Sequence, residues 1–180
     1  MRVVAGSARG VPLKAPNGME TRPTADRVKE ALFSILHFDI PGAIVLDLFG
    51  GTGQLGIEAL SRGAKRAVFV DASRAACNLI GENLKKTSFS QQATVVCSDY
   101  MSYLKTCRDS FNLILLDPPY AEVFLENSLK MITEIDILQS GGIIATERPA
   151  GKSILDQIPG FSRSKDYKYG NTIITLYRKD

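Results

Sequence analysis

The sequence predicts an α/β protein with a doubly wound, mostly parallel sheet of seven strands. From residue 43 onward, apolar strand-like runs alternate with helical patterns, which is typical of this class. Runs such as Phe111 to Leu116 are almost continuously apolar, as strands buried on both faces are. The chain has 180 residues, of which 44% are hydrophobic and 23% are charged. These values fit one globular domain and exclude disorder as the main state.

The expected elements begin with a segment rich in Gly and Pro, residues 1–23, which predicts a short strand or hairpin followed by a loop. A helix is expected to begin near Thr24, a good N-cap residue, because the apolar positions after it recur at helical spacing. Strands are then expected at residues 43–48, 66–70, 93–97, 111–116 and 142–146. The expected helices lie at residues 55–61, after Ser73 as N-cap, at 100–106 and at 122–135, with a helical turn at 154–158. Two last strands, 161–167 and 172–177, predict a C-terminal antiparallel hairpin that turns at Gly170 and Asn171.

We expect a single domain, in which residues 1–40 are a short N-terminal extension of hairpin, loop and helix and residues 41–180 form the main body. No apolar run is long enough to cross a bilayer, and the N-terminus lacks the apolar core of a secretory signal. The cysteines have no metal-ligand or disulfide spacing, and Cys97 is expected to lie in the core. The sequence therefore predicts a cytoplasmic protein with no metal site and no membrane segment.

Basic charge is concentrated at the two ends of the chain. The net charge of +3 is made up of +3 in residues 1–30, −4 in residues 31–147 and +4 in residues 148–180. If the two ends meet in the fold, they present a surface for a polyanion such as nucleic acid. An ordinary solvated surface explains segments of this charge equally well.

A glycine loop follows the first expected strand. Gly51, Gly53 and Gly56 have the spacing G-x-G-x-x-G, and Asp71, at the end of the second strand, lies 20 residues after Gly51. Glycines let the backbone turn tightly and approach a ligand, and an acid at that distance binds ribose hydroxyls in dinucleotide folds. This region alone fits NAD or another nucleoside cofactor, with a mere tight turn as the alternative.

Asp47 favours one of these cofactors. Its carboxylate, just before the glycines, would repel a pyrophosphate but suits the amino group or ribose of S-adenosyl-L-methionine, which has no phosphate. Asp99, after the third strand, is expected to accept from the adenine amino group, a role compatible with capping the next helix. The residues expected to hold S-adenosyl-L-methionine are Asp47, Phe49, Gly50, Gly51, Thr52, Gly53, Leu55, Asp71, Ser98 and Asp99.

The fourth strand runs directly into Asp117-Pro118-Pro119-Tyr120. Two prolines end a strand and leave carbonyl groups without neighbouring N–H donors. Asp117 and the Pro118 carbonyl together can accept both hydrogens of an amino group on an aromatic base, so that its nitrogen attacks a methyl group. Tyr120 offers a flat face on which the base stacks. The sequence therefore favours catalytic roles for these four residues over a simple strand-terminating turn.

These two motifs, Asp47 to Gly53 and Asp117 to Tyr120, resemble those of the class I S-adenosylmethionine-dependent amino-methyltransferases. The resemblance implies a Rossmann-like methyltransferase domain over residues 41–180 and methyl transfer to an amino nitrogen. Enzymes that methylate adenine N6, cytosine N4, guanine N2 and the glutamine amide nitrogen share the second motif, so it does not specify the substrate.

The N-terminal segment resembles the RsmD family in particular. The resemblance rests on Arg2 to Gly6 and above all on the block from Arg22 to Phe33, and it extends over almost the whole chain. It implies methylation of guanine N2 at one nucleotide of bacterial small-subunit (16S) ribosomal RNA, with an assembled or partly assembled 30S particle as the substrate. It also implies that Arg22, Thr24 and Arg27 help to form the pocket, where an N-cap and solvated helix charges are the alternative.

Three other functions remain open at this point. An adenine-N6 DNA methyltransferase shares both motifs but usually carries an additional target-recognition region, for which 180 residues leave little room. A nicotinamide-dependent dehydrogenase shares only the glycine loop and Asp71. A non-catalytic RNA-binding or assembly factor keeps the basic ends but needs no intact motif at Asp117.

Overall fold

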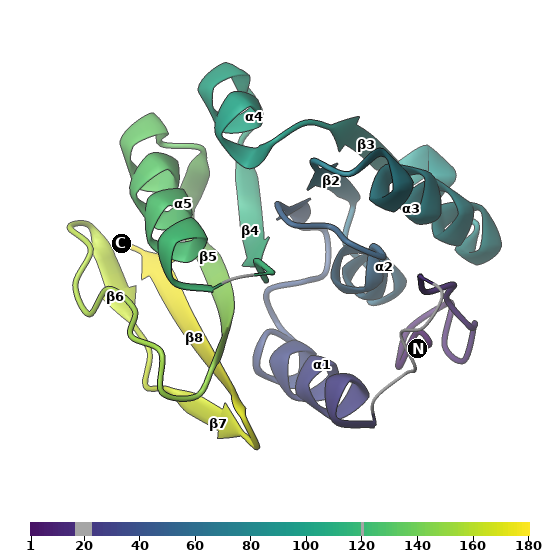
Figure 1. The fold of residues 1–180 in the computed structure, drawn as a ribbon, viewed down its shortest axis with the longest axis horizontal. Helices are drawn as coiled ribbons and strands as arrows, with labels where there is room; N and C mark the ends of the chain where they lie inside the picture. The colour runs from purple at the N-terminus through teal and green to yellow at the C-terminus, as the bar shows by residue number, and fades with distance from the viewer. Residues whose placement is uncertain (17–22, 120) are drawn as a thin grey trace.

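The structure is a computed structural model that describes residues 1–16, 23–119 and 121–180, and it consists of a central sheet between helices (Figure 1). The strands are β1 (Ile44–Asp47), β2 (Arg66–Asp71), β3 (Ala93–Cys97), β4 (Phe111–Leu116), β5 (Leu138–Pro149), β6 (Phe161–Arg163), β7 (Tyr167–Tyr169) and β8 (Thr172–Lys179). The helices are α1 (Pro23–Ile35), α2 (Gln54–Ser61), α3 (Arg74–Thr87), α4 (Tyr100–Thr106) and α5 (Ala121–Ile135), with a short 3-10 helix η1 (Ser90–Gln92).

The sheet is doubly wound. The strand order is β3-β2-β1-β4-β5-β8-β6, with β7 also paired to β8. Strands β1 to β5 pair in parallel, and β8 pairs antiparallel with β5, β6 and β7. This confirms the predicted fold class. Because the order reverses between β1 and β4, the crevice beyond the carboxyl ends of these strands is where such sheets bind ligands.

Two hydrophobic cores lie on opposite faces of the sheet. In β4, Leu113 and Leu115 belong to the core formed with α1, α2 and α3, whereas Ile114 and Leu116 belong to the core formed with α4 and α5. Successive side chains of a strand point to opposite faces, so both faces of the central strands are buried under helices. This burial explains why the strands read as continuous apolar runs.

The helical turn predicted at residues 154–158 is absent. This part of the chain is irregular, and Ile154 and Ile158 are buried in the core beside α5. The hydroxyl of Tyr177 donates to the carbonyl of Leu155 and fixes the segment. The four-residue spacing that predicted a helical turn therefore belongs to two loop side chains that pack into the same core.

The strand predicted at residues 161–167 is interrupted, so the sheet has eight strands instead of seven. Its two parts, β6 and β7, pair with opposite ends of β8. Between them, Asp166 accepts hydrogen bonds from Arg148 at 2.7 Å, Arg163 at 2.9 Å and the Thr175 hydroxyl at 2.7 Å. The chain leaves the sheet edge where these bonds form, and it returns for the predicted turn at Gly170 and Asn171 between β7 and β8.

The prediction that Cys97 lies in the core is wrong, because Cys97 is exposed. Strand β3, which carries it, is an edge strand with β2 as its neighbour in the sheet, and most of its residues are only partly buried. The apolar composition of the strand did not indicate its position at the edge.

Residues 1–13 form a small hairpin, in which the Val3 N–H donates to the Val11 carbonyl at 3.0 Å. The N–H of Lys14, directly after it, donates to Asn83 Oδ1 on α3 at 2.8 Å. In Figure 1, helix α1 lies between this hairpin and strand β7. Within the described ranges, no helix is long and apolar enough to cross a membrane.

Candidate functional site

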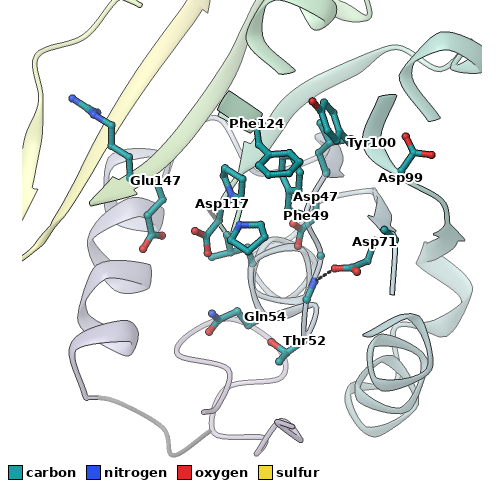
Figure 2. Close-up of a pocket in the computed structure, with 18 of the residues that line it drawn as sticks. Asp47, Phe49, Thr52, Gln54, Asp71, Asp99, Tyr100, Asp117, Phe124 and Glu147 are labelled. Atoms are coloured by element: carbon teal, nitrogen blue, oxygen red, sulfur yellow. Dashed lines mark hydrogen bonds between the residues drawn. The ribbon is translucent and has the colours of Figure 1, made fainter. Parts of the chain in front are cut away.

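A cavity of about 940 Å³ lies at the carboxyl ends of the parallel strands. Its lining includes an acidic residue from each of four strand ends, namely Asp47, Asp71, Asp117 and Glu147, together with Asp99 after β3. Figure 2 shows that Asp71 and Asp99 lie at one side of this cavity and Asp117 and Glu147 at the other, with Asp47 and Phe49 between them. The predicted cofactor residues all line the cavity except Gly53.

The glycine loop is a tight turn held by backbone hydrogen bonds. The Gly50 N–H donates to the Val70 carbonyl at 2.9 Å, and the Gly53 N–H donates to the Gly50 carbonyl at 2.7 Å. Gly53 has φ 79°, a left-handed conformation that side chains rarely adopt. Gly53 therefore shapes the turn, while Gly50 and Gly51 face the cavity.

Gly56, the third glycine, allows α2 to approach the sheet closely. A Cβ on Gly56 would lie 2.3 Å from Cε1 of Phe69 on β2. The close approach packs the start of α2, which follows the glycine loop, against β2. Gly56 is thus required for packing, and not for contact with a ligand.

Asp47 is almost fully buried at the end of β1, and its Oδ2 accepts from the Gly56 N–H at 3.0 Å. The N-cap residue of α2 is Gly53, which has no side chain, so Asp47 takes over part of the capping from a neighbouring strand. Burial raises the pKa of Asp47 to about 7, and the nearby Asp117 and Asp71 add to the shift. Burial thus disfavours the ionised form of Asp47, and a bound cation would stabilise that form.

Asp71 joins two loops. Its Oδ2 accepts from the Gly51 N–H and its Oδ1 from the Ser73 N–H, both at 2.8 Å (Figure 2 shows the first). A carboxylate has about four acceptor positions, so two remain for a ligand such as a pair of ribose hydroxyls. Asp71 thus supports the glycine loop and can still bind a ligand.

Asp99 caps helix α4, because its Oδ1 accepts from the Ser102 N–H at 2.9 Å. This bond lowers the pKa of Asp99, which is exposed and ionised. Ser98, beside it, is tied to the second strand through its N–H, which donates to the Asp71 carbonyl at 3.0 Å. The cap and a contact with a ligand are compatible, since Asp99 lines the cavity and a carboxylate has about four acceptor positions.

Asp117 follows β4, and within residues 1–16, 23–119 and 121–180 no donor forms a hydrogen bond with its carboxylate. Burial raises its pKa to about 6. Pro118 and Pro119 also line the cavity. Neither proline has an N–H group, so the turn offers acceptors and no backbone donors to a ligand. Tyr120, the last residue of the motif, lies outside the described residues.

Glu147, near the end of β5, is a cavity residue that the sequence reasoning missed. Thr146 pairs with Leu116 across the β4–β5 ladder, so Glu147 and Asp117 occupy neighbouring positions in the two strands. Burial raises the pKa of Glu147 to about 8, and the Asp117 carboxylate contributes to the shift. Glu147 comes directly after the strand predicted at residues 142–146, so a search for polar residues after every strand would have found it.

Two further features of the cavity were also missed. Phe49, Tyr100 and Phe124 form an aromatic cluster with ring centroids 5.4 to 6.4 Å apart, and all three line the cavity. Gln54, at the start of α2, has a buried Oε1 without a hydrogen-bond partner among the described residues. Phe124 and Tyr100 come from different helices, so only the fold brings them together.

The RsmD resemblance assigned Arg22, Thr24 and Arg27 to the pocket. Arg22 and the side chain of Thr24 lie outside the description of the structure. Arg27 is exposed on α1 and does not line the cavity. In the same sequence block, Lys29 is buried and its Nζ donates to the Arg2 carbonyl at 2.6 Å. Part of this block therefore anchors the N-terminal hairpin.

The cavity fits a cationic nucleoside better than a dinucleotide. Burial raises the pKa values of Asp47, Asp117 and Glu147, and repulsion from neighbouring carboxylates adds to the shifts of Asp47 and Glu147. A sulfonium and an ammonium group would relieve this repulsion, whereas a pyrophosphate would increase it. Among the described residues that line the cavity, Arg148 is the one Lys or Arg, and it pairs with Asp166 at 2.7 Å. Among the described residues, no group of three or more His, Cys, Asp or Glu side chains could hold a metal ion.

The fold and this cavity define an α/β protein with the class I methyltransferase architecture. The chain belongs to the RsmD family: residues 1–178 match the family model described as "Conserved hypothetical protein 95".

Individual relatives agree with this assignment. The chain is 37% identical to a candidate rRNA methyltransferase, YlbH, from Bacillus subtilis, and the match covers 99% of each chain. It is 32% identical to the Ribosomal RNA small subunit methyltransferase D of Escherichia coli K12, with 100% of this chain and 90% of that protein covered. A solved structure of yhhF, a candidate methyltransferase from Escherichia coli, superimposes with a TM-score of 0.90 at 30% identity and covers 100% of this chain and 98% of that one.

Proposed function

We propose that this protein transfers a methyl group from S-adenosyl-L-methionine to the exocyclic N2 amino group of a guanine in bacterial small-subunit ribosomal RNA. The observation that carries the proposal is the carboxylate of Asp117 beside Pro118, which has no hydrogen-bond donor among the described residues and lies in the same cavity as the glycine loop and Asp71. The relatives that are named small-subunit ribosomal RNA methyltransferases support the RNA substrate.

The cofactor is held by the side of the cavity that contains Asp71 and Asp99. Asp71 is placed to accept from ribose hydroxyls and Asp99 from the adenine amino group, while the aromatic cluster offers flat faces to the purine. Asp47 and the glycine loop face the charged amino acid portion. When bound, S-adenosyl-L-methionine supplies an electrophilic methyl group on a sulfonium centre.

The other side of the cavity holds the target base. Asp117 and the Pro118 carbonyl accept the two hydrogens of the amino group. These hydrogen bonds fix the position of the nitrogen and make its delocalised lone pair more nucleophilic. The nitrogen forms the new N–C bond while the C–S bond breaks and leaves a neutral thioether. The proton that the methylated nitrogen gives up passes to the Asp117 carboxylate, which is an acceptor when ionised. The base must leave its stack to reach this site, at a cost of a few kcal/mol.

A ribosomal particle fits the surface of the protein better than naked RNA does. Of the basic residues in the C-terminal segment, Arg148 and Arg163 pair with Asp166, Arg178 with Asp39 and Lys179 with Asp136. These ion pairs leave less positive charge for phosphate contacts, on which affinity for RNA depends. Ribosomal proteins of an assembled or partly assembled 30S particle would supply further recognition, in the cytoplasm where ribosomes are built.

The experiment that tests this function measures methyl transfer from labelled S-adenosyl-L-methionine into unmodified small ribosomal subunits, naked ribosomal RNA and DNA, followed by nucleoside analysis. We expect label in N2-methylguanosine from the ribosomal substrates alone. Label in methyladenine, or in DNA only, would keep the chemistry and overturn the substrate. Absence of label together with NADH binding would instead indicate a dehydrogenase, and absence of both a non-catalytic factor.

A further inference from the structure

Beside Asp117 the cavity carries a second carboxyl group that the methyl transfer itself does not use. Glu147 follows Thr146, which pairs with Leu116, so Glu147 stands next to Asp117 in the register of the two strands. The backbones of neighbouring strands are about 4.8 Å apart. Figure 2 shows the Asp117 and Glu147 side chains next to each other, on the side of the cavity away from Asp99 and Tyr100. A base whose amino group meets Asp117 would therefore present the adjoining ring atom to Glu147.

No cation of the described residues neutralises Glu147. The next residue, Arg148, is buried and directs its guanidinium away, to the Lys152 carbonyl at 3.0 Å, to the Thr175 hydroxyl at 2.5 Å and to Asp166 at 2.7 Å. Thr146, on the other side, donates its hydroxyl to the Thr175 carbonyl at 3.0 Å. The polar groups of Thr146 and Arg148 are thus bonded within the protein, whereas Glu147 lines the cavity and forms no hydrogen bond or ion pair with the described residues.

We propose that Glu147 selects guanine by accepting the N1–H of the target base while Asp117 holds its N2 amino group. This assignment rests on the proposed function and names the feature that decides among the substrates sharing the Asp117 motif. Guanine carries a hydrogen on N1 directly beside its amino group, so it presents two adjacent donors to two adjacent carboxyl groups. Adenine and cytosine carry a lone pair on the ring nitrogen beside their amino groups, which an ionised Glu147 would repel.

The electrostatics of the pair support the same assignment. Burial and the Asp117 carboxylate raise the pKa of Glu147 to about 8, so its ionised form is disfavoured as long as no N–H group is bound to it. A hydrogen bond from an N–H group stabilises the ionised form of a carboxyl group, so the N1–H and the amino hydrogens of guanine supply what the two acids lack. A site built to satisfy a buried polar group discriminates strongly against a ligand that leaves it unpaired.

The test uses small subunits reconstituted with either guanosine or 2-aminopurine at the methylated position. 2-Aminopurine keeps the amino group at C2, but its N1 has no hydrogen. For the wild type we expect kcat/KM to be roughly 10- to 100-fold higher with guanosine. In Glu147→Gln the ratio should fall to about 3-fold or less, because an amide both accepts from an N1–H and donates to a bare N1.

Three comparisons make the result specific. Glu134→Gln, which removes the same charge from the exposed end of α5, should keep the wild-type ratio. Glu147→Asp keeps the charge and should keep the preference for guanosine at a lower kcat/KM, which shows that the protein remains folded. The assignment would be overturned if Glu147→Gln kept the wild-type ratio, or if the wild type methylated both bases equally. Neither outcome would contradict the proposed function. If the wild type forms no N2-methylguanosine at all, the proposed function fails and the role of Glu147 falls with it.

Discussion

Lys29 on α1 and Glu58 on α2 form a buried ion pair, with Lys29 Nζ 3.7 Å from Glu58 Oε2. Glu58 also accepts from the Val4 N–H at 2.8 Å and from the Ala5 N–H at 2.9 Å. The pair therefore fixes the N-terminal hairpin against the helix that follows the glycine loop. Burial lowers the pKa of Lys29, although the Glu58 carboxylate opposes this shift.

The two partners of this pair should differ in their effect on stability. Glu58→Ala removes the carboxylate partner of the buried Lys29 and leaves the Val4 and Ala5 N–H groups without an acceptor, so we expect it to lower the free energy of unfolding by about 3–5 kcal/mol. Lys29→Met should cost less, because Glu58 keeps Val4, Ala5 and Arg62 as donors. Urea unfolding of both variants measures the difference. Equal costs would mean that the ammonium is the main partner of Glu58.

Asp117→Ala should abolish methyl transfer and preserve the cofactor site. The variant removes the acceptor for the target amino group, so we expect kcat to fall by about 100-fold or more. Affinity for S-adenosyl-L-methionine, measured by calorimetry, should stay within about 3-fold. Glu134→Ala, on the exposed end of α5, is the control for the loss of a charge. Normal turnover in Asp117→Ala would exclude the catalytic role.

The activity should also depend on pH in a defined direction. Burial raises the pKa of Asp117 to about 6, and only the ionised form accepts both a hydrogen bond and a proton. We therefore expect kcat to fall as the pH drops through about 6, as measured in a pH series of single-turnover reactions. In Asp117→Asn, which cannot ionise, this acidic limb should disappear from whatever activity remains.

Asp71→Ala should weaken cofactor binding by roughly 10- to 100-fold, through loss of two ligand acceptors and of the bonds to Gly51 and Ser73. Calorimetric titration with S-adenosyl-L-methionine measures this change. Glu30→Ala, an exposed acid on α1, should leave the affinity as in the wild type. An unchanged affinity in Asp71→Ala would place the ribose elsewhere in the cavity.

Two glycines in helices provide a matched pair for stability. Gly56→Ala forces a methyl group to within 2.3 Å of the Phe69 ring, so we expect it to destabilise the protein by about 1–3 kcal/mol. Gly81→Ala on α3 meets nothing within 4 Å and should stabilise the protein by about 0.5–1 kcal/mol, because alanine favours helix. Thermal unfolding distinguishes them. Stabilisation by both changes would show that α2 moves away from the sheet freely.

Asp47→Asn should stabilise the protein and weaken its binding of the cofactor. The pKa of Asp47 is about 7 in the folded protein and about 3.9 in an unfolded chain, so ionisation of Asp47 favours unfolding as the pH rises between these values. Asparagine keeps an oxygen for the Gly56 N–H without the charge. We expect the variant to gain roughly 1–3 kcal/mol over the wild type between pH 5 and pH 8, in denaturant titrations. A gain that is independent of pH would contradict a raised pKa.

The sequence predicted the central sheet well, for a physical reason. The buried strands on either side of the switch point repeat one local pattern, an apolar run followed by a glycine or a proline, and this pattern does not depend on distant residues. The positions of Asp47 and Asp117 at one edge of the sheet follow from that pattern, and that of Asp71 from the end of the apolar run before it. The strand order then brings them into one cavity, as parallel sheets do.

Features that depend on tertiary contacts were not predictable in the same way. The exposure of Cys97 depends on the edge position of β3, and the break between β6 and β7 coincides with the bonds of Asp166 to Arg148 and Arg163. The burial of Lys29 depends on its contacts with Arg2 and Glu58, which are distant from it in the sequence. Glu147 was predictable from the sequence, because it directly follows the fifth predicted strand and ligands bind at the carboxyl ends of parallel strands.

The two hydrogen bonds of Asp71 also affect the entropy of ligand binding. Because one carboxylate already joins the backbone at Gly51 to the backbone at Ser73, the two loops cannot fluctuate independently. A ligand that enters between them finds its acceptors and N–H groups already in place, so it does not have to order a loose segment. The conformational entropy of these loops is therefore lost during folding and not during binding, so more of the contact energy contributes to affinity.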